Sequence, residues 1–373
     1  MSNVPLVDLK ASHAQVADEV AAGWEGVLAK TAFILGPDVG AFEKEFAEFV
    51  GVDHCVGVAS GTDALELVLR AMGIGPGDEV IIPANTFIAT AMSAVRCGAS
   101  IVMVDCDDEY QLMDPAQVGS AITDCTKAII PVHLFGQVAP MEAIGHISGD
   151  SGVPVVEDAA QAHGATQDGR NAGQFGVAAS WSFYPGKNLG AYGDGGGVTM
   201  NDEKLRDAVI ALRNYGSAAK YEHPGEGYNS RLDTLQAVVL RAKLKRLADW
   251  NAARRAAAAR YDDLLKDIEE VRTPKTMPQN THVFHLYPIR VQNRDTVLAQ
   301  LHEQGIGAGI HYPKALHLQG AFAHLGHKEG VFPNAENAAA TMISLPMFPE
   351  ITEQQQSRVV ECLKNALSSA VAG

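Results

Sequence analysis

An isolated lysine lies in a stretch that is poor in charge and rich in glycine and aromatic residues. Lys187 belongs to SFYPGKNLGAYGDGGG, residues 182–197, and is the only lysine between Lys127 and Lys204. A lysine becomes a nucleophile or a base when burial or a nearby cation lowers its pKa. Its neighbours are untypical of a solvated helix face, so a chemical role for Lys187 competes here with a structural one.

Two adjacent carboxylates end an apolar run in VPVVEDAAQAHGA, residues 153–165. Glu157 and Asp158 could cap a helix, or they could face a cationic ligand. Gln161 and His163 follow within one turn and could add hydrogen bonds.

A phosphate site is indicated by ASGTDAL, residues 59–65, where Gly61 and Thr62 lie between a predicted strand and a predicted helix. Exposed N–H groups at a helix N-terminus bind phosphate, although SGTD is equally typical of an ordinary helix cap. Phe87, in ANTFIAT, could stack on a ligand ring or belong to the core. A lysine, an acidic partner for a ring nitrogen and a phosphate cradle are together what pyridoxal phosphate requires.

The elements that must position these residues alternate between strands and helices from residue 54 to about 200. Apolar runs at 54–60, 77–84, 100–105, 127–134, 153–160 and 178–184 predict strands, and 195–200 is expected to return antiparallel. Residues 61–73 and 87–98 predict helices. Val- and Ile-rich strands without alternation favour a mostly parallel sheet covered on both faces, hence an α/β domain. Ligands bind such sheets at the carboxyl ends of the strands.

The pattern changes after residue 230. Residues 231–268 predict one bent helix or two, 282–292 a strand, and 294–305, 334–343 and 352–369 helices. We therefore predict a large domain over residues 1–249 and a smaller α+β domain over 250–373.

Composition excludes several classes of function. The net charge of −15, from 29 basic and 44 acidic residues, argues against a nucleic-acid or anionic-membrane partner, because both need a basic surface. The five cysteines have no zinc-like or redox-like spacing, so we expect no metal and reduced thiols. No signal peptide and no membrane-length apolar run is found, which predicts a cytoplasmic protein.

Six ordered segments resemble the DegT/DnrJ/EryC1/StrS sugar aminotransferases, within the fold-type I class of pyridoxal-phosphate enzymes. They are ILGPDVGAFEKEFAEFVG, SGTDALELVLRAMGIGPGDEVIIPANTFIAT, VEDAAQAHGA, SFYPGKNLGAYGDGG, YNSRLDTLQAVVLRAKL and HYPKALHLQ. The resemblance implies an aspartate-aminotransferase-like large domain with a mostly parallel mixed sheet. It also implies a homodimer that shares its active sites, with L-glutamate as the amino donor.

Residue by residue, the resemblance assigns a cofactor site. Lys187 matches the Schiff-base lysine and Asp158 the partner of the pyridinium nitrogen. Further matches are Gln161 at the phenolic oxygen, Phe87 on the ring face, Ser182, Gly61 and Thr62 at the phosphate, and Asn229 at the phosphate of the neighbouring subunit. Tyr184, His311, Tyr312 and His317 match positions near the nucleotide sugar.

Two residues depart from the family pattern: Ala315 stands where a proline is frequent, and Trp181 where a phenylalanine is frequent. The first bears on the shape of the substrate loop and the second on packing. A sister group of dehydratases has histidine in place of the lysine, and Lys187 argues against it.

YPGKNLGAYGDGG is more similar to enzymes that act on 3-keto sugars than to the 4-keto branch, which tends to have histidine at the position of Tyr184. The predicted substrate is therefore a dTDP-3-keto-6-deoxyhexose. The alternatives are amination of a 4-keto nucleotide sugar or a cyclitol, and a non-catalytic regulatory protein that keeps the fold.

Overall fold

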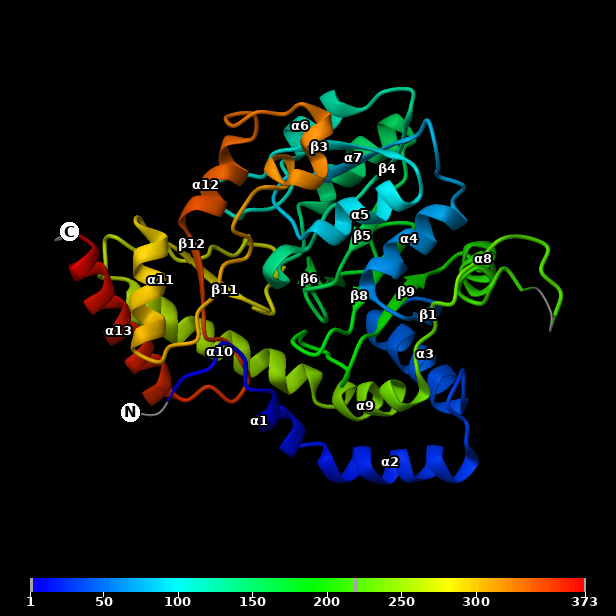
Figure 1. Ribbon diagram of the computed structural model, residues 1–373, viewed down its shortest axis with the longest axis horizontal. Coiled ribbons are helices and arrows are strands. Elements are labelled where there is room, and N and C mark those ends of the chain that lie inside the picture. Colours follow the sequence, from blue (N-terminus) through cyan, green and yellow to red (C-terminus); the bar gives the residue numbers. More distant parts are fainter. Residues whose placement is uncertain (1–2, 218–220, 372–373) are drawn as a thin grey trace.

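The computed structural model describes residues 3–217 and 221–371, and a twisted sheet lies at the centre of its larger part (Figure 1). The strands are β1 (His54–Val58), β2 (Glu79–Pro83), β3 (Ser100–Val104), β4 (Thr126–Ile129), β5 (Val156–Asp158), β8 (Ala178–Ser182) and β9 (Gly196–Met200). Two hydrogen-bonded groups, β3-β2-β4 and β1-β9-β8-β5, are joined by parallel bridges between Ile129 and Val155 and between Val132 and Asp158. Only β9 runs antiparallel to its neighbours, as its short connection predicts.

Helices cover both faces of this sheet, because successive strand residues point to opposite sides. Ile81 belongs to one buried cluster, which includes Phe42 of α3 (Pro37–Val50). Val80 belongs to a second cluster, which includes Leu65 of α4 (Gly61–Ala71). The remaining helices of this part are α5 (Ile88–Arg96), α6 (Pro115–Ala121), α7 (Met141–Ser151), α8 (Glu203–Arg213) and α9 (Thr234–Leu244). The predicted α/β architecture is confirmed.

The C-terminal part packs helices on a two-stranded antiparallel sheet of β11 (Tyr287–Arg290) and β12 (Met342–Leu345). Its helices are α10 (Leu247–Leu265), α11 (Arg294–Glu303), α12 (Pro333–Thr341) and α13 (Glu353–Val371). A separate apolar core includes Tyr261, Ile289 and Leu363, together with Val4 from the chain start. The boundary between residues 249 and 250 stays a prediction, and α10 runs through it.

Further elements lie among the described residues. They are α1 (Leu9–Ala14), α2 (Ala17–Lys30), β6 (Thr166–Gln167), β7 (Arg170–Asn171), β10 (Asn280–Thr281) and the 3₁₀ turns η1 (Leu134–Gly136), η2 (Leu316–Leu318) and η3 (Gly320–Leu325). The strand predicted over 282–292 is shorter than expected, because residues 282–286 pair with the η1 turn instead: the N–H of Val283 donates to the carbonyl of Gly136 at 2.9 Å. The last strand, β12, was not predicted.

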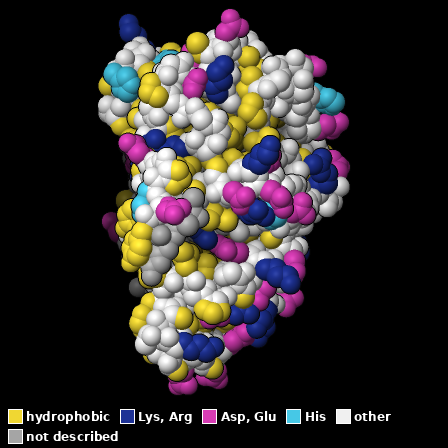
Figure 2. Space-filling model, turned by 90° about the vertical axis from the view of Figure 1, so that its right-hand side faces the viewer, with side chains coloured by type: hydrophobic (Ala, Val, Ile, Leu, Met, Phe, Trp, Pro, Cys, Tyr) yellow, Lys and Arg dark blue, Asp and Glu magenta, His cyan; other side chains and the backbone are white. Residues whose placement is uncertain are grey.

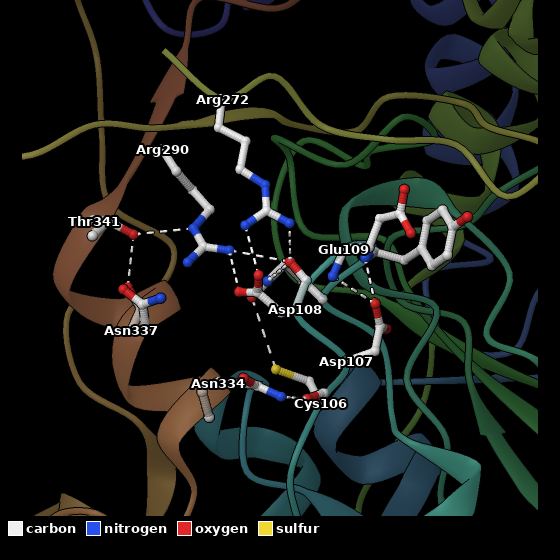
Figure 3. Close-up of polar contacts among 12 residues, drawn as sticks. Cys106, Asp107, Asp108, Glu109, Arg272, Arg290, Asn334, Asn337 and Thr341 are labelled. Carbon is white, nitrogen blue, oxygen red and sulfur yellow. Dashed lines mark hydrogen bonds and ion pairs between the residues drawn. The ribbon is translucent and has the colours of Figure 1, made fainter. Parts of the chain in front are cut away.

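An ion-pair cluster joins the two parts of the chain (Figure 3). Asp108, in the loop after β3, accepts hydrogen bonds from Arg272 and Arg290, each at 2.6 Å. Arg290 is the more buried of the two arginines, and it also donates to Thr341 at 3.2 Å. Asp108 therefore connects a large-sheet loop to β11 and the end of α12. Within the described ranges, no helix combines the length and the apolar character needed to cross a bilayer.

Candidate active site

A cavity of about 460 Å³ lies where β5 and β8 end, at the carboxyl edge of the sheet. Ten of the predicted site residues line it: Gly61, Thr62, Phe87, Asp158, Gln161, Ser182, Tyr184, Lys187, His311 and Tyr312. Strands β5 and β8 are parallel neighbours. Their ends therefore bring the acidic candidate, Asp158, and the basic candidate, Lys187, to one place.

Lys187 lies in the turn that follows β8, where its N–H donates to the carbonyl of Tyr184 at 2.8 Å. Burial lowers the pKa of Lys187 from 10.5 to about 8, and the negative charge of Asp158 opposes that shift. A substantial fraction of the amine is therefore neutral, and so able to act as nucleophile or base, near pH 8. This environment favours the chemical interpretation of Lys187 over the structural one.

Asp158 is buried at the end of β5, with 6% of its surface exposed. Its Oδ2 accepts a hydrogen bond from Thr90 Oγ1 at 2.8 Å, and its Oδ1 accepts one from the N–H of Ala160 at 3.2 Å. Burial raises the pKa of this carboxyl group, while the two hydrogen bonds and Lys187 partly offset the effect. A cationic ring nitrogen next to Asp158 would also oppose the effect of burial and lower the pKa of the carboxyl group.

Glu157 has a structural role and so differs from its neighbour Asp158. It is fully buried, and its carboxylate accepts hydrogen bonds from the N–H groups of Gly173, Phe175 and Gly176, each at 2.7 Å, and a contact from His133 Nε2 at 2.8 Å. Because neighbouring strand residues point to opposite faces, Asp158 faces the cavity and Glu157 does not. The ligand-facing interpretation holds for Asp158 alone.

Gln161 is fixed by a backbone donor. Its Oε1 accepts from the N–H of Phe135 at 2.6 Å, which leaves Nε2 to donate, and Nε2 lies 3.1 Å from the hydroxyl of Tyr312. The orientation of this amide is therefore determined, with a donor presented on the cavity side.

Helix α4 begins in the cavity wall beside the end of β8. Ser60 caps it by accepting from the N–H of Asp63 at 3.1 Å, so the cap interpretation of SGTD is right for Ser60. Gly61 and Thr62 still line the cavity at the positive end of the helix dipole. A Cβ on Gly61 would lie 2.7 Å from Ser182 Cβ, which means that a glycine is needed for this close approach.

Phe87 belongs to the cavity wall and not to the core, since 51% of its surface is exposed. Its ring centroid lies 5.3 Å from that of Tyr312, with the planes tilted by 37°. Tyr184 is also exposed into this region, at 60%. Phe87 thus offers the cavity an exposed aromatic face on which a ring could stack.

Three residues singled out from the sequence lie outside the cavity lining. His317 is buried, and its Nε2 contacts Glu336 Oε1 at 2.9 Å. His163 packs with the rings of Phe46 and Trp181. Asn229 is exposed and pairs with Asn214 through a backbone bridge.

Sequence reasoning missed several residues that build the site. Thr90, which holds Asp158, lies one turn beyond Phe87, and His285 lies in a segment that the apolar pattern assigned to a strand. Leu6 and Asp194 also line the cavity. Only tertiary packing brings these positions together, since nothing in their local sequence distinguishes them.

Comparisons with known proteins show the family of this chain. The model of the DegT/DnrJ/EryC1/StrS aminotransferase family matches residues 15–364. A Geobacillus stearothermophilus protein named "Pleiotropic regulatory protein" is 48% identical over 361 residues, covering 96% of this chain and 97% of that protein. A Streptomyces venezuelae protein, dTDP-3-amino-3,4,6-trideoxy-alpha-D-glucose transaminase, is 44% identical over 361 residues, covering 97% and 95%.

The solved structure of S. venezuelae DesV in complex with a ketimine intermediate superposes with a TM-score of 0.95. It is 43% identical and covers 98% of both chains. The fold and these relatives therefore define a fold-type I, pyridoxal-phosphate-dependent aminotransferase, as the sequence resemblance predicted. More narrowly, the chain belongs to the DegT/DnrJ/EryC1/StrS aminotransferase family, whose members include the nucleotide-sugar aminotransferases.

Proposed function

We propose that this protein transfers an amino group from L-glutamate to C3 of a dTDP-3-keto-6-deoxyhexose, with pyridoxal phosphate held in the cavity of Lys187. The observation that carries the proposal is the pairing of Lys187, whose pKa is lowered to about 8, with buried Asp158 in one cavity. The S. venezuelae transaminase supports the choice of a dTDP-linked 3-amino sugar.

The residues present fit this cofactor. Gly61, Thr62 and Ser182 form a narrow cradle at a helix N-terminus, which suits a phosphate, and Asp158 suits a protonated ring nitrogen. Phe87 supplies a wall for the ring, and Gln161 presents an amide donor to a ring oxygen. When bound, pyridoxal phosphate supplies an electron-withdrawing ring that stabilises negative charge on the carbon that loses or gains the amino group.

Lys187 has two tasks in this proposal. Its Nζ would hold the cofactor in the resting protein. The free amine would move a proton, first away from the carbon of the donor and later to the sugar carbon. Asp158 would hold the ring nitrogen, and Thr90 supports the ionised form of the carboxylate through its hydrogen bond.

A homodimer that shares its sites is part of the proposal. Asn229 is exposed and lies away from the cavity of its own chain, which leaves it free to reach a neighbour. Phe33, Ile34 and Leu35 expose 42%, 54% and 37% of their surfaces after α2, more apolar surface than a solvated loop needs. Figure 2 shows hydrophobic side chains exposed among charged ones on the face at the right of Figure 1. Sedimentation with cofactor-binding assays of Asn229→Ala would test this arrangement.

We also propose that the protein works in the cytoplasm, because each of its five cysteines is a free thiol in the structure. Fractionation of the source cells with an antibody would test the location.

The direct test of the reaction is an assay with 3-keto and 4-keto nucleotide sugars, linked to dTDP or UDP, and with glutamate or glutamine as donor. We expect amination of the dTDP-3-keto sugar with glutamate, with the position of the amine established by NMR. Amination at C4, or of a cyclitol only, would contradict the proposed substrate.

The name of the Geobacillus relative favours a regulatory role as second candidate. A colourless protein that takes up no pyridoxal phosphate would support that candidate.

A further inference from the structure

His285 lies in the wall of the Lys187 cavity, although the roles described so far leave it unused. Its backbone is held from two sides. Gly136, at φ +103, packs so closely that a Cβ there would lie 2.9 Å from the His285 nitrogen, and Arg254 donates to the carbonyl of Phe284 at 3.1 Å. The imidazole is therefore presented from a fixed segment, and only 9% of the residue is exposed.

A chain of amide groups determines which ring nitrogen of His285 carries the proton. Asn251 Nδ2 donates to the carbonyl of His163 at 2.8 Å, and Asn188 Nδ2 donates to the carbonyl of Val283 at 3.1 Å. Backbone carbonyl groups only accept hydrogen bonds, so both amide orientations are set. Asn251 Oδ1 then accepts from Asn188 Nδ2 at 2.9 Å.

Asn188 Oδ1 is consequently the atom that faces His285, at 3.2 Å from Nδ1. An amide oxygen only accepts, so Nδ1 of His285 must carry the hydrogen. Burial lowers the pKa of His285 well below 6.5, and the charges of Lys187 and Arg254 add to that effect. The ring is therefore neutral, and its Nε2 is a hydrogen-bond acceptor.

Nε2 of His285 has no hydrogen-bond partner among the described residues. It is also not among the side-chain nitrogen and oxygen atoms that are both fully buried and without a partner, so it keeps some accessible surface. Because His285 lines the cavity and its Nδ1 is engaged with Asn188, Nε2 is the ring nitrogen left to face that space. A nine-tenths buried, oriented acceptor next to Lys187 calls for a donor supplied by a ligand.

We propose that His285 is a substrate-binding residue whose Nε2 accepts a hydrogen bond from a sugar hydroxyl next to the carbon that receives the amine. This inference rests on the proposed function. A neutral acceptor suits a hydroxyl group, and such a contact distinguishes a hydroxylated sugar from its deoxy analogue. Asn188, directly after Lys187 in the chain, couples the position of this acceptor to the lysine loop.

Two variants separate ligand binding from structure. His285→Asn can keep the donor to Asn188 but removes the acceptor from the cavity, whereas His285→Gln can place an amide oxygen near Nε2 but loses the bond to Asn188. We expect kcat/KM for the keto sugar to fall about 10-fold in His285→Asn, and by less in His285→Gln. The reverse order would show that only the amide chain matters and would overturn the inference.

The substrate contrast is measured with the 2-deoxy and 4-deoxy analogues of the dTDP-3-keto sugar. Wild type should discriminate against one analogue by about 10-fold, and His285→Asn should lose that discrimination. Titration calorimetry with the amino-sugar product should show the same loss in affinity. Equal effects on all sugars, or an effect confined to KM for glutamate, would contradict the proposal.

His282→Asn is the control, since His282 is also buried, with 3% of its surface exposed, but does not line this cavity. It should leave the discrimination unchanged. If the wild-type enzyme aminates no nucleotide keto sugar at all, the proposed function fails and this inference fails with it. If wild type is active and His285→Asn discriminates like wild type, only this inference fails.

Discussion

Thr90 Oγ1 donates a hydrogen bond to Asp158 Oδ2 at 2.8 Å inside the protein, and this bond favours the ionised carboxylate. Thr90 is fully buried in α5, so no water can replace its hydroxyl without rearrangement. Helix α5 thus reaches across to the end of β5 and helps to set the charge of the residue expected to hold the cofactor ring.

Replacing Thr90 with valine should raise the pKa of Asp158, because burial then acts with less opposition. A hydrogen bond to a charged group is worth about 1.5–3 kcal/mol, so affinity for pyridoxal phosphate should fall about 10-fold or more. Absorbance titration measures this affinity. Ser93→Ala, one turn away in α5, is the control; equal losses in both variants would point to a general packing defect.

Lys187→Ala should abolish transamination, with a fall in kcat of at least about 100-fold, because the residue is expected to move the proton. The fold should persist, as the hydrogen bond from Lys187 to Tyr184 is made by the main-chain N–H, which alanine keeps. Single-turnover assays and circular dichroism provide the two readouts. Turnover at the wild-type rate would remove Lys187 from the mechanism.

In the cofactor-free protein, Lys187 and Lys243 should react with acylating reagents at lower pH than the exposed lysines, because burial lowers both pKa values to about 8. The pKa of Lys187 is lowered to about 8, so labelling should be half-maximal near pH 8. The ordinary pKa of lysine is about 10.4, so between pH 8 and pH 10 the unfolded chain binds more protons than the folded chain. The free energy of unfolding should therefore rise as pH increases from 8 to 10. Peptide mass spectrometry after pulse labelling identifies the site. Lys127 serves as an exposed reference.

Gly61→Ala should weaken phosphate binding, because the new Cβ would lie 2.7 Å from Ser182 Cβ and would push the two walls of the cradle apart. Overpacking of this kind costs about 1–3 kcal/mol. Cofactor affinity should fall accordingly, measured by equilibrium dialysis. Gly119→Ala, in α6, meets nothing within 4 Å and should leave affinity unchanged.

Asp108→Asn should loosen the connection between the two parts of the chain. Burial opposes ionisation of Asp108, but Arg272 and Arg290 outweigh it and lower its pKa. The stabilisation is therefore complete above the unfolded value of about 3.9 and is lost as pH falls through the lower folded value. Because Asp108 is 43% exposed, we expect a loss of only about 1 kcal/mol at pH 7, vanishing in acid.

Urea unfolding of Asp108→Asn at pH 7 and at pH 3 measures that difference. The control is Asp263→Asn, whose carboxylate is 81% exposed and pairs with Lys266 at 3.7 Å. A pH-independent difference for Asp108→Asn would contradict an ionic origin.

Much of the site could be predicted from local sequence. Runs such as 153–158 and 178–184 had to become buried strands, and parallel neighbours had to deliver Asp158 and Lys187 to the same edge. A glycine and a threonine at the start of a helix could be assigned to an anion for the same reason. Each of these inferences depends on a few consecutive residues.

Tertiary structure decided the features of the site that no local sequence pattern determines. It alone separated Asp158 from Glu157, placed Phe87 in the cavity wall instead of the core, and left His317 outside. It also brought Thr90 and His285 to the site from positions 68 and 98 residues away from Asp158 and Lys187. The physical reason is that strand and helix periodicities follow from adjacent residues, whereas burial and hydrogen-bond partners depend on which distant segments pack together.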